Sequence, residues 1–183
     1  MTILNQNDSI LLVIDVQEKL INAVFNPETI KKNAQILAKA SSLLGLPIVI
    51  TEQYPKGLGN TIEGINGDKY FEKTSFDALS EEAVLEELKN SERKQVIVLG
   101  IETHICVHQT VAGLIDKGFD VTVVSDACSS RREESYQIGI DCMKSNGAQI
   151  KSIMARTISG YPPKRTAAMD SPLLLGSVMI VSA

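Results

Sequence analysis

The sequence predicts an α/β fold, a three-layer αβα sandwich in which a mostly parallel, Rossmann-like sheet lies between two layers of helices. Short runs of β-branched and aliphatic residues alternate along the chain with segments of helical periodicity. The runs are largely apolar, which is typical of strands that helices cover on both faces. With 183 residues the chain is expected to form one domain over residues 1–183.

Five segments have the character of buried strands. Each is short, apolar and rich in valine or isoleucine. In order they are Ile10–Val16, Pro47–Thr51, Gln95–Gly100, Phe119–Ser125 and Ala148–Met154.

Four helices are expected between these strands. The first has Asn26 as its N-cap, Pro27 at its first position and Gly45 just beyond its end. The others are expected at Ser80–Leu88, Thr103–Gly118 and Arg131–Gly147. A long connection, Glu52–Glu72, contains four glycines and is expected at the carboxyl ends of the strands, where α/β proteins bind ligands.

Composition narrows the class of protein. The chain has 44% hydrophobic and 22% charged residues, which is typical of a globular protein. A net charge of −4 argues against nucleic-acid and anionic-membrane partners, so a small-molecule substrate is expected. The first residues lack the basic stretch of a signal peptide, which favours a cytoplasmic location. Three cysteines without CxxC spacing predict free thiols.

Three polar residues are candidates for chemistry. Asp15 ends an apolar strand, so its carboxylate is expected at the edge of the sheet; a turn-forming role is the alternative. Cys106 lies in the first turn of a predicted helix, where free N–H groups stabilise a thiolate and lower the pKa; an inert buried cysteine is the alternative. Lys73 ends the glycine-rich connection, and a solvated surface cation is its alternative role.

Taken together, the motifs around these residues resemble those of the isochorismatase-like cysteine hydrolases, over about residues 8–155. In chain order the motifs are LLVIDVQ, TEQYPKGLG, FEKTSF, VIVLGIETHICV and SDACSSR. They are similar to the metal-free branch that includes YcaC-like and isochorismatase-domain-containing proteins. The tail, residues 156–183, does not follow the family pattern; a subunit contact, an edge strand and a disordered end are all open interpretations.

The resemblance implies an Asp15, Lys73 and Cys106 catalytic triad. It implies that the backbone N–H groups of Glu102 and Cys106 form an oxyanion hole, and that the peptide bond from Ile101 to Glu102 is cis. It also implies a homo-oligomer. Asp15 would take the thiol proton, Lys73 would stabilise the anion, and Cys106 would form a thioester.

No metal or other cofactor is expected. Zinc-binding relatives use histidines between the catalytic Asp and Lys, whereas the first histidine of this chain is His104. Gln53 and Tyr54 occupy that neighbourhood and, with Phe25, are candidates for binding substrate. His104 and His108 would share a helix face from which Cys106 points away, so a metal site or a Cys–His dyad there is the less favoured interpretation.

The expected function is therefore metal-independent hydrolysis of a small amide, or of a related C–N or ester bond. The alternative is a catalytically idle or promiscuous oligomeric interaction protein of the same fold. A redox-sensing role for Cys106 is a third and weaker hypothesis.

Overall fold

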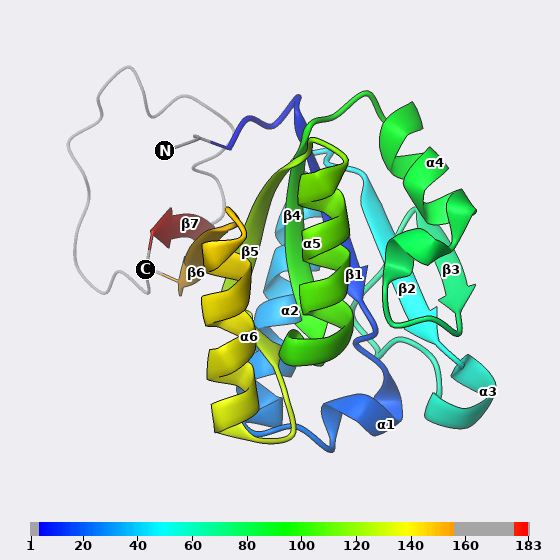
Figure 1. The fold of residues 1–183 in the computed structure, drawn as a ribbon, viewed down its shortest axis with the longest axis vertical. Helices are drawn as coiled ribbons and strands as arrows, with labels where there is room; N and C mark the ends of the chain where they lie inside the picture. Colours follow the sequence, from blue (N-terminus) through cyan, green and yellow to red (C-terminus); the bar gives the residue numbers. More distant parts are fainter. Residues whose placement is uncertain (1–3, 156–177, 183) are drawn as a thin grey trace.

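The computed structural model describes residues 4–155 and 178–182, and a seven-stranded sheet forms its centre (Figure 1). Its strand order is β3-β2-β1-β4-β5-β6-β7. Strands β1 to β6 are parallel, and β7 pairs antiparallel with β6. The strands are β1 (Ser9–Ile14), β2 (Ile48–Gln53), β3 (Lys69–Lys73), β4 (Gln95–Ile101), β5 (Asp120–Ser129), β6 (Gln149–Ala155) and β7 (Val178–Ser182).

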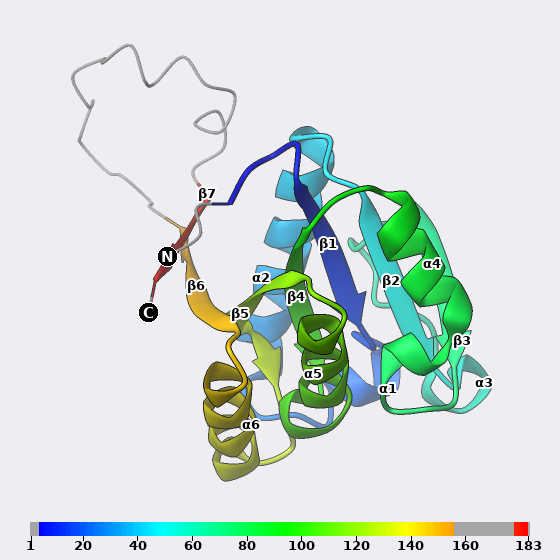
Figure 2. The same cartoon turned by 45° about the horizontal axis from the view of Figure 1, so that its top comes forward.

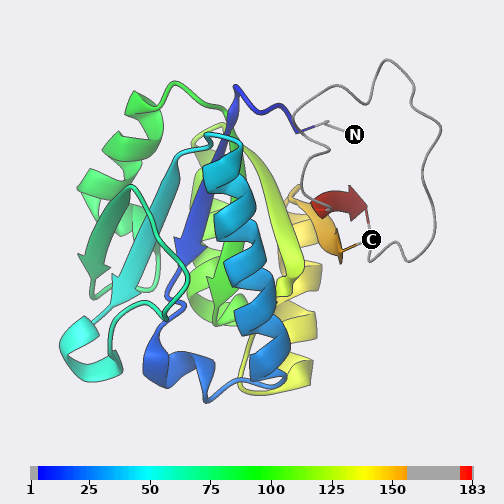
Figure 3. The ribbon, with the colours of Figure 1, turned by 180° about the vertical axis from the view of Figure 1, so that it is seen from behind.

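Helices cover both faces of this sheet, which confirms the predicted αβα sandwich. Helix α2 (Pro27–Leu43) crosses one face (Figure 3). Helices α4 (Glu82–Asn90), α5 (His108–Asp116) and α6 (Glu133–Ser145) lie on the other face (Figure 2). The short elements are α1 (Glu18–Ile21), α3 (Pro55–Leu58), the 3-10 turn η1 (Ala78–Ser80) and the π-helical turn η2 (Thr103–Val107).

The core lies where the apolar runs predict it. Every residue of β1 and β4 is buried, as expected for central strands with helices on both sides. Helix α2 buries a stripe with helical spacing, which includes Ile30, Ala34 and Leu37. The sheet packs against α2, and the polar candidates Asp15 and Lys73 lie at the ends of its strands.

The predicted connection Glu52–Glu72 is only partly a loop, which corrects the interpretation of Lys73 as a loop residue. It contains α3 and most of the edge strand β3, and Lys73 is the last residue of that strand. Strand β3 consists of three charged and two aromatic residues, KYFEK, and most of them are exposed at the sheet edge. It therefore lacks the apolar run by which a buried strand is recognised.

The structure describes only part of the C-terminal tail. The atypical tail lies outside the described residues over 156–177 and at 183. Val178–Ser182 forms β7, which agrees with the edge-strand interpretation. Within residues 4–155 and 178–182, none of the helices has the length and apolarity needed to cross a bilayer.

The strand order reverses direction at β1, because β2 follows on one side of it and β4 on the other. Open parallel sheets bind ligands in the crevice beyond the carboxyl ends of such neighbouring strands. In this sheet β1 ends at Ile14 and β4 ends at Ile101, and Ile14 is the register partner of Gly100. A ligand is therefore expected to contact the residues that follow β1 and β4.

Gly100 allows β1 and β4 to approach each other at this point. Its φ is +151°, and a Cβ there would collide with the carbonyl oxygen of Ile14. We expect Gly100→Ala to lower the free energy of unfolding by about 3 kcal/mol or more, because backbone strain adds to overpacking. Urea unfolding measures the loss.

Gly118 provides the matched control for this variant. Its φ is also positive, at +84°, but a Cβ there would meet nothing within 4 Å. Gly118→Ala should therefore lose only about 1 kcal/mol, from the left-handed conformation alone. Equal losses in the two variants would contradict the close approach of Gly100 to Ile14.

Candidate active site

Asp15 lies at the end of β1 with its carboxylate fully buried. Its φ of 54° ends the strand two residues earlier than the apolar run predicts. The carboxylate is held by the neighbouring strand, because Thr51 Oγ1 donates to Asp15 Oδ1 at 2.8 Å. The backbone N–H of Asp15 donates to Thr51 O at 3.1 Å. Thr51 therefore holds both the carboxylate and the backbone of Asp15.

Lys73 forms a buried ion pair with Asp15. Its Nζ lies 2.6 Å from Asp15 Oδ2, and neither side chain is exposed to solvent. Lys73 Nζ also donates to Gln53 Oε1 at 2.6 Å and to the carbonyl oxygen of Ser75 at 3.1 Å. A buried ion pair is stable only when further hydrogen bonds compensate for lost hydration, and these two bonds do so for the ammonium.

Cys106 completes the cluster from the other side of the crevice. It lies in the turn η2, which follows β4, and it is 6% exposed. The thiol and the Asp15 carboxylate lie close enough to change each other's pKa, and the backbone of Glu102 lowers the pKa of Cys106. The structure thus brings Asp15, Lys73 and Cys106 together, although the first and the last of them are 91 positions apart in the sequence.

The pKa of Cys106 contradicts the expectation of a stabilised thiolate. Burial raises the pKa of Cys106 to about 12, and the negative charge of Asp15 acts in the same direction. Lys73 and the N–H of Glu102 lower the pKa, but they do not offset these two effects. The prediction was wrong because a helix start indicates nearby N–H groups, whereas burial and the adjacent carboxylate depend on tertiary structure.

The pKa of Asp15 is raised, because burial penalises its charged form more than Lys73 stabilises that form. A carboxyl group with a raised pKa is a better proton acceptor than an exposed aspartate. Asp15 can therefore act as a base toward the neutral thiol that it contacts.

The turn that holds Cys106 begins with an unusual backbone. The peptide bond between Ile101 and Glu102 is cis, at the position that the family resemblance implies. The side chain of Glu102 is bound by Arg131, whose backbone N–H lies 3.1 Å from Oε2 and whose Nε lies 3.2 Å from Oε1. Arg131 thereby fixes the residue whose N–H faces the sulfur.

The two histidines take no part in this cluster. His104 Nδ1 lies 2.9 Å from Ser130 Oγ, which turns its ring toward the end of β5 rather than toward Cys106. Among residues 4–155 and 178–182, no group of three or more His, Cys, Asp or Glu side chains is arranged to hold a metal ion.

The three candidate substrate residues lie in different settings. Gln53 is half-buried and bonded to Lys73. Phe25 packs edge-on against Tyr136, with ring centroids 5.4 Å apart. The backbone N–H of Phe25 donates to Ser130 O at 3.0 Å, next to the Arg131 contact. Tyr54 is 57% exposed, beyond the end of β2.

Sequence analysis did not assign functional roles to Thr51 and Gln17, the two residues that brace the cluster. Thr51 holds Asp15, and Gln17 is fully buried and bonded to the backbone of Gln53. The available signal was a polar residue at the end of each of two adjacent apolar runs. It becomes interpretable only when the strands are known to be neighbours.

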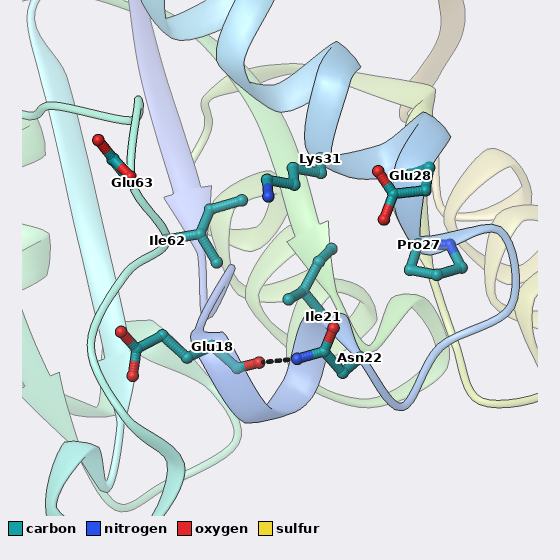
Figure 4. A pocket seen from close by; sticks show the side chains of 8 residues that line it. All are labelled: Glu18, Ile21, Asn22, Pro27, Glu28, Lys31, Ile62 and Glu63. Carbon is teal, nitrogen blue, oxygen red and sulfur yellow. Dashed lines mark hydrogen bonds between the residues drawn. The ribbon is translucent and has the colours of Figure 1, made fainter.

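A separate hollow of about 210 Å³ lies at the start of α2 (Figure 4). Glu18, Glu28 and Lys31 line it, together with apolar atoms of Ile21 and Ile62. None of the three clustered residues contributes to its wall. It is therefore distinct from the crevice between β1 and β4.

Comparison with known proteins identifies the family. The model of the isochorismatase domain matches residues 9–154. The chain belongs to the isochorismatase family. This match confirms the resemblance drawn from the sequence motifs, and membership of this family supports a hydrolase-type function.

Individual relatives agree with this assignment. The isochorismatase domain-containing protein 2 of Xenopus laevis is 41% identical over 149 residues, which cover 79% of this chain and 72% of the relative. The structure of YcaC from Pseudomonas aeruginosa, with hexane-2,5-diol and covalent acrylamide, is 26% identical with a TM-score of 0.78, covering 81% and 78% of the two chains. YcaC from Escherichia coli, described as an octameric hydrolase of unknown specificity, is 27% identical with a TM-score of 0.78, covering 81% and 77%.

The electrostatics of this isochorismatase-family site can be tested by alkylation. Asp15 raises the pKa of Cys106, so Asp15→Asn should lower that pKa and speed alkylation by iodoacetamide at pH 9. Each unit by which the pKa falls should raise the rate about tenfold, because the thiolate is the reactive form. Peptide mass spectrometry follows Cys106 separately from Cys128 and Cys142.

Asp126→Asn is the control for this experiment. Asp126 raises the pKa of the other buried thiol, Cys128, and does not act on Cys106. This variant should leave alkylation of Cys106 unchanged. Slower alkylation of Cys106 in Asp15→Asn would show that proton acceptance by Asp15 outweighs its electrostatic effect on the thiol, which is the opposite of the expected result.

Proposed function

We propose that this protein is a metal-independent cysteine hydrolase that cleaves the amide bond, or a related C–N or ester bond, of a small molecule. One observation carries the proposal. A buried carboxylate, Asp15, contacts both a buried ammonium, Lys73, and a buried thiol, Cys106. Desolvating these groups is unfavourable for stability, and their joint position at the crevice is suited to chemistry.

The first step is attack on the carbonyl carbon. Cys106 Sγ forms a C–S bond while its proton passes to the Asp15 carboxylate, the acidic group whose charge acts on the thiol. Because the pKa of Cys106 is about 12, the thiol loses its proton during attack rather than before it. The carbonyl oxygen becomes an oxyanion, which the N–H groups of Glu102 and Cys106 are proposed to bind.

The second step releases the leaving group. The tetrahedral intermediate collapses, the C–N bond breaks, and the proton on Asp15 moves to the leaving nitrogen. Water then attacks the thioester, giving up one proton to Asp15, and that proton returns to Cys106 as the C–S bond breaks. The products are an amine and a carboxylic acid, and the site returns to its initial state.

Lys73 acts as a fixed positive charge in this scheme. Its ion pair with Asp15 and its hydrogen bonds to Gln53 and Ser75 hold the ammonium among protein acceptors. It stabilises the ionised Asp15 before attack and the anion that replaces it afterwards. Since the two buried charges compensate each other, a neutral substrate suits the site better than a charged one.

The relatives add support for a reactive thiol. Acrylamide is a neutral amide and an electrophile that alkylates thiolates, and it is bound covalently in the YcaC structure from Pseudomonas aeruginosa. We therefore expect small neutral amides to reach Cys106 in this chain. Phe25 and Tyr54 remain candidates for the substrate pocket.

Assembly and location belong to the same proposal. The YcaC of Escherichia coli is octameric, and we propose that this chain also forms a homo-oligomer. The cytoplasmic location and the single-domain organisation inferred from the sequence stay predictions.

A panel of small amides, ureides and esters tests the function. We expect turnover of at least one neutral amide by the wild type, and loss of that turnover in Cys106→Ala with the thermal midpoint retained. Treatment with EDTA should leave the wild-type rate unchanged. Absence of turnover across the panel would instead favour the alternative, a catalytically idle interaction protein.

The oligomer is tested by light scattering. At micromolar concentration the wild type should have a mass that is a multiple of 19.9 kDa. Cys106→Ala provides a control, because removal of the thiol should not change the mass. A monomer mass for the wild type would exclude the proposed assembly.

A further inference from the structure

Gln53 and Lys73 are placed together by the register of the sheet. They are paired residues on the neighbouring parallel strands β2 and β3. Side chains at paired positions project from the same face, and residues two apart on one strand share a face as well. Thr51, which holds Asp15, therefore lies on the same face of β2 as Gln53.

The hydrogen bonds of Gln53 fix the orientation of its amide. Its Nε2 donates to the carbonyl oxygen of Thr74 at 2.8 Å, which leaves Oε1 to accept from Lys73 Nζ at 2.6 Å. The reverse orientation would place an NH2 group against an ammonium, with two donors facing each other. Both ends of the Gln53 side chain are thus engaged by protein atoms.

Gln17 holds Gln53 from the opposite side. Its Oε1 accepts from the backbone N–H of Gln53 at 2.7 Å, and its Nε2 donates to the carbonyl oxygen of Gln53 at 3.1 Å. The same Nε2 donates to the carbonyl oxygen of Gly59 at 2.6 Å. The Gln17 side chain is fully buried and continues the pairing of β1 with β2 beyond the point where Asp15 ends the strand.

We propose that Gln53 is a positioning residue that acts through Lys73, and that Gln17 in turn positions Gln53. The inference rests on the proposed function and reassigns Gln53 from the substrate pocket to the support of the triad. A chain of contacts runs from Gln17 through Gln53 and Lys73 to Asp15, and ends at the thiol. Gln53 supplies the acceptor that keeps the ammonium directed at Asp15.

The chemical reason lies in the needs of a buried ammonium. Lys73 has three N–H donors, and a buried donor without an acceptor is unfavourable. If Gln53 is removed, the ammonium can satisfy its donors only by moving, and its distance to Asp15 and Cys106 changes. Lys73 lowers the pKa of Cys106, so its displacement should make the thiolate harder to form.

The test measures alkylation of Cys106 by iodoacetamide at pH 9, followed by peptide mass spectrometry. Gln53→Met keeps the length of the side chain but removes the acceptor. We expect its alkylation rate to fall by about 10 to 100-fold, as a misplaced group near a reacting atom does. Gln53→Glu retains an acceptor but adds a negative charge, so it should also slow alkylation.

Glu52→Met is the matched control. Glu52 precedes Gln53 on β2 and also ties the strand to the following segment, because its Oε1 accepts from Thr61 N at 2.6 Å and Thr61 Oγ1 at 2.7 Å. These bonds hold the Glu52 carboxylate at Thr61, whereas the side chain of Gln53 is bonded to Lys73. A loss of strand anchoring alone would affect both methionine variants, whereas the proposal predicts slower alkylation only for Gln53→Met.

A substrate found in the amide panel gives a second readout. Gln53→Met should lower kcat by a factor similar to the fall in alkylation rate, with KM changed less than about twofold. A raised KM with wild-type kcat and wild-type alkylation would identify Gln53 as a substrate ligand and overturn the inference. Failure of the proposed function is distinguishable, because the wild type would then turn over no member of the panel, whereas the alkylation rates would still compare Gln53→Met with the wild type.

Discussion

The buried ion pair between Asp15 and Lys73 is the interaction on which this site depends. Its 2.6 Å contact joins the end of the central strand β1 to the end of the edge strand β3, across β2. Thr51 and Gln53, both on β2, supply the hydrogen bonds that make a fully buried pair tolerable. The turn η2, which follows β4, places the Cys106 thiol close to the Asp15 carboxylate.

The same arrangement explains why the thiol is kept neutral. A Cys106 thiolate at rest would lie beside the negatively charged Asp15 carboxylate in a buried crevice. Lys73 would then be the single positive charge that compensates two negative charges. In the proposed mechanism the negative charge stays on Asp15 until the proton is transferred, and it then moves to the attacked oxygen. The net charge of the buried groups is the same before and after that transfer.

Much of this arrangement can be predicted from sequence, and the rest depends on contacts between strands. Asp15 and Cys106 follow apolar runs, so strand periodicity alone places them near the edge of the sheet. Lys73 could not be placed in this way, because β3 consists of charged and aromatic residues and has no apolar run. The pKa of Cys106 and the role of Gln53 depend on burial and on register, neither of which is present in local sequence.

The exposure of β3 has a consequence for folding. Of its five residues only Lys73 is buried, whereas Lys69, Tyr70 and Glu72 are exposed. An edge strand with so little buried side-chain surface makes few apolar contacts that would favour one alignment with β2 over another. A slip of β3 by one residue would turn Lys73 to the other face of the sheet. Burial of Lys73 against Asp15 therefore also favours one alignment of the strand that carries it, so the residue proposed for catalysis contributes to the correct pairing of this edge.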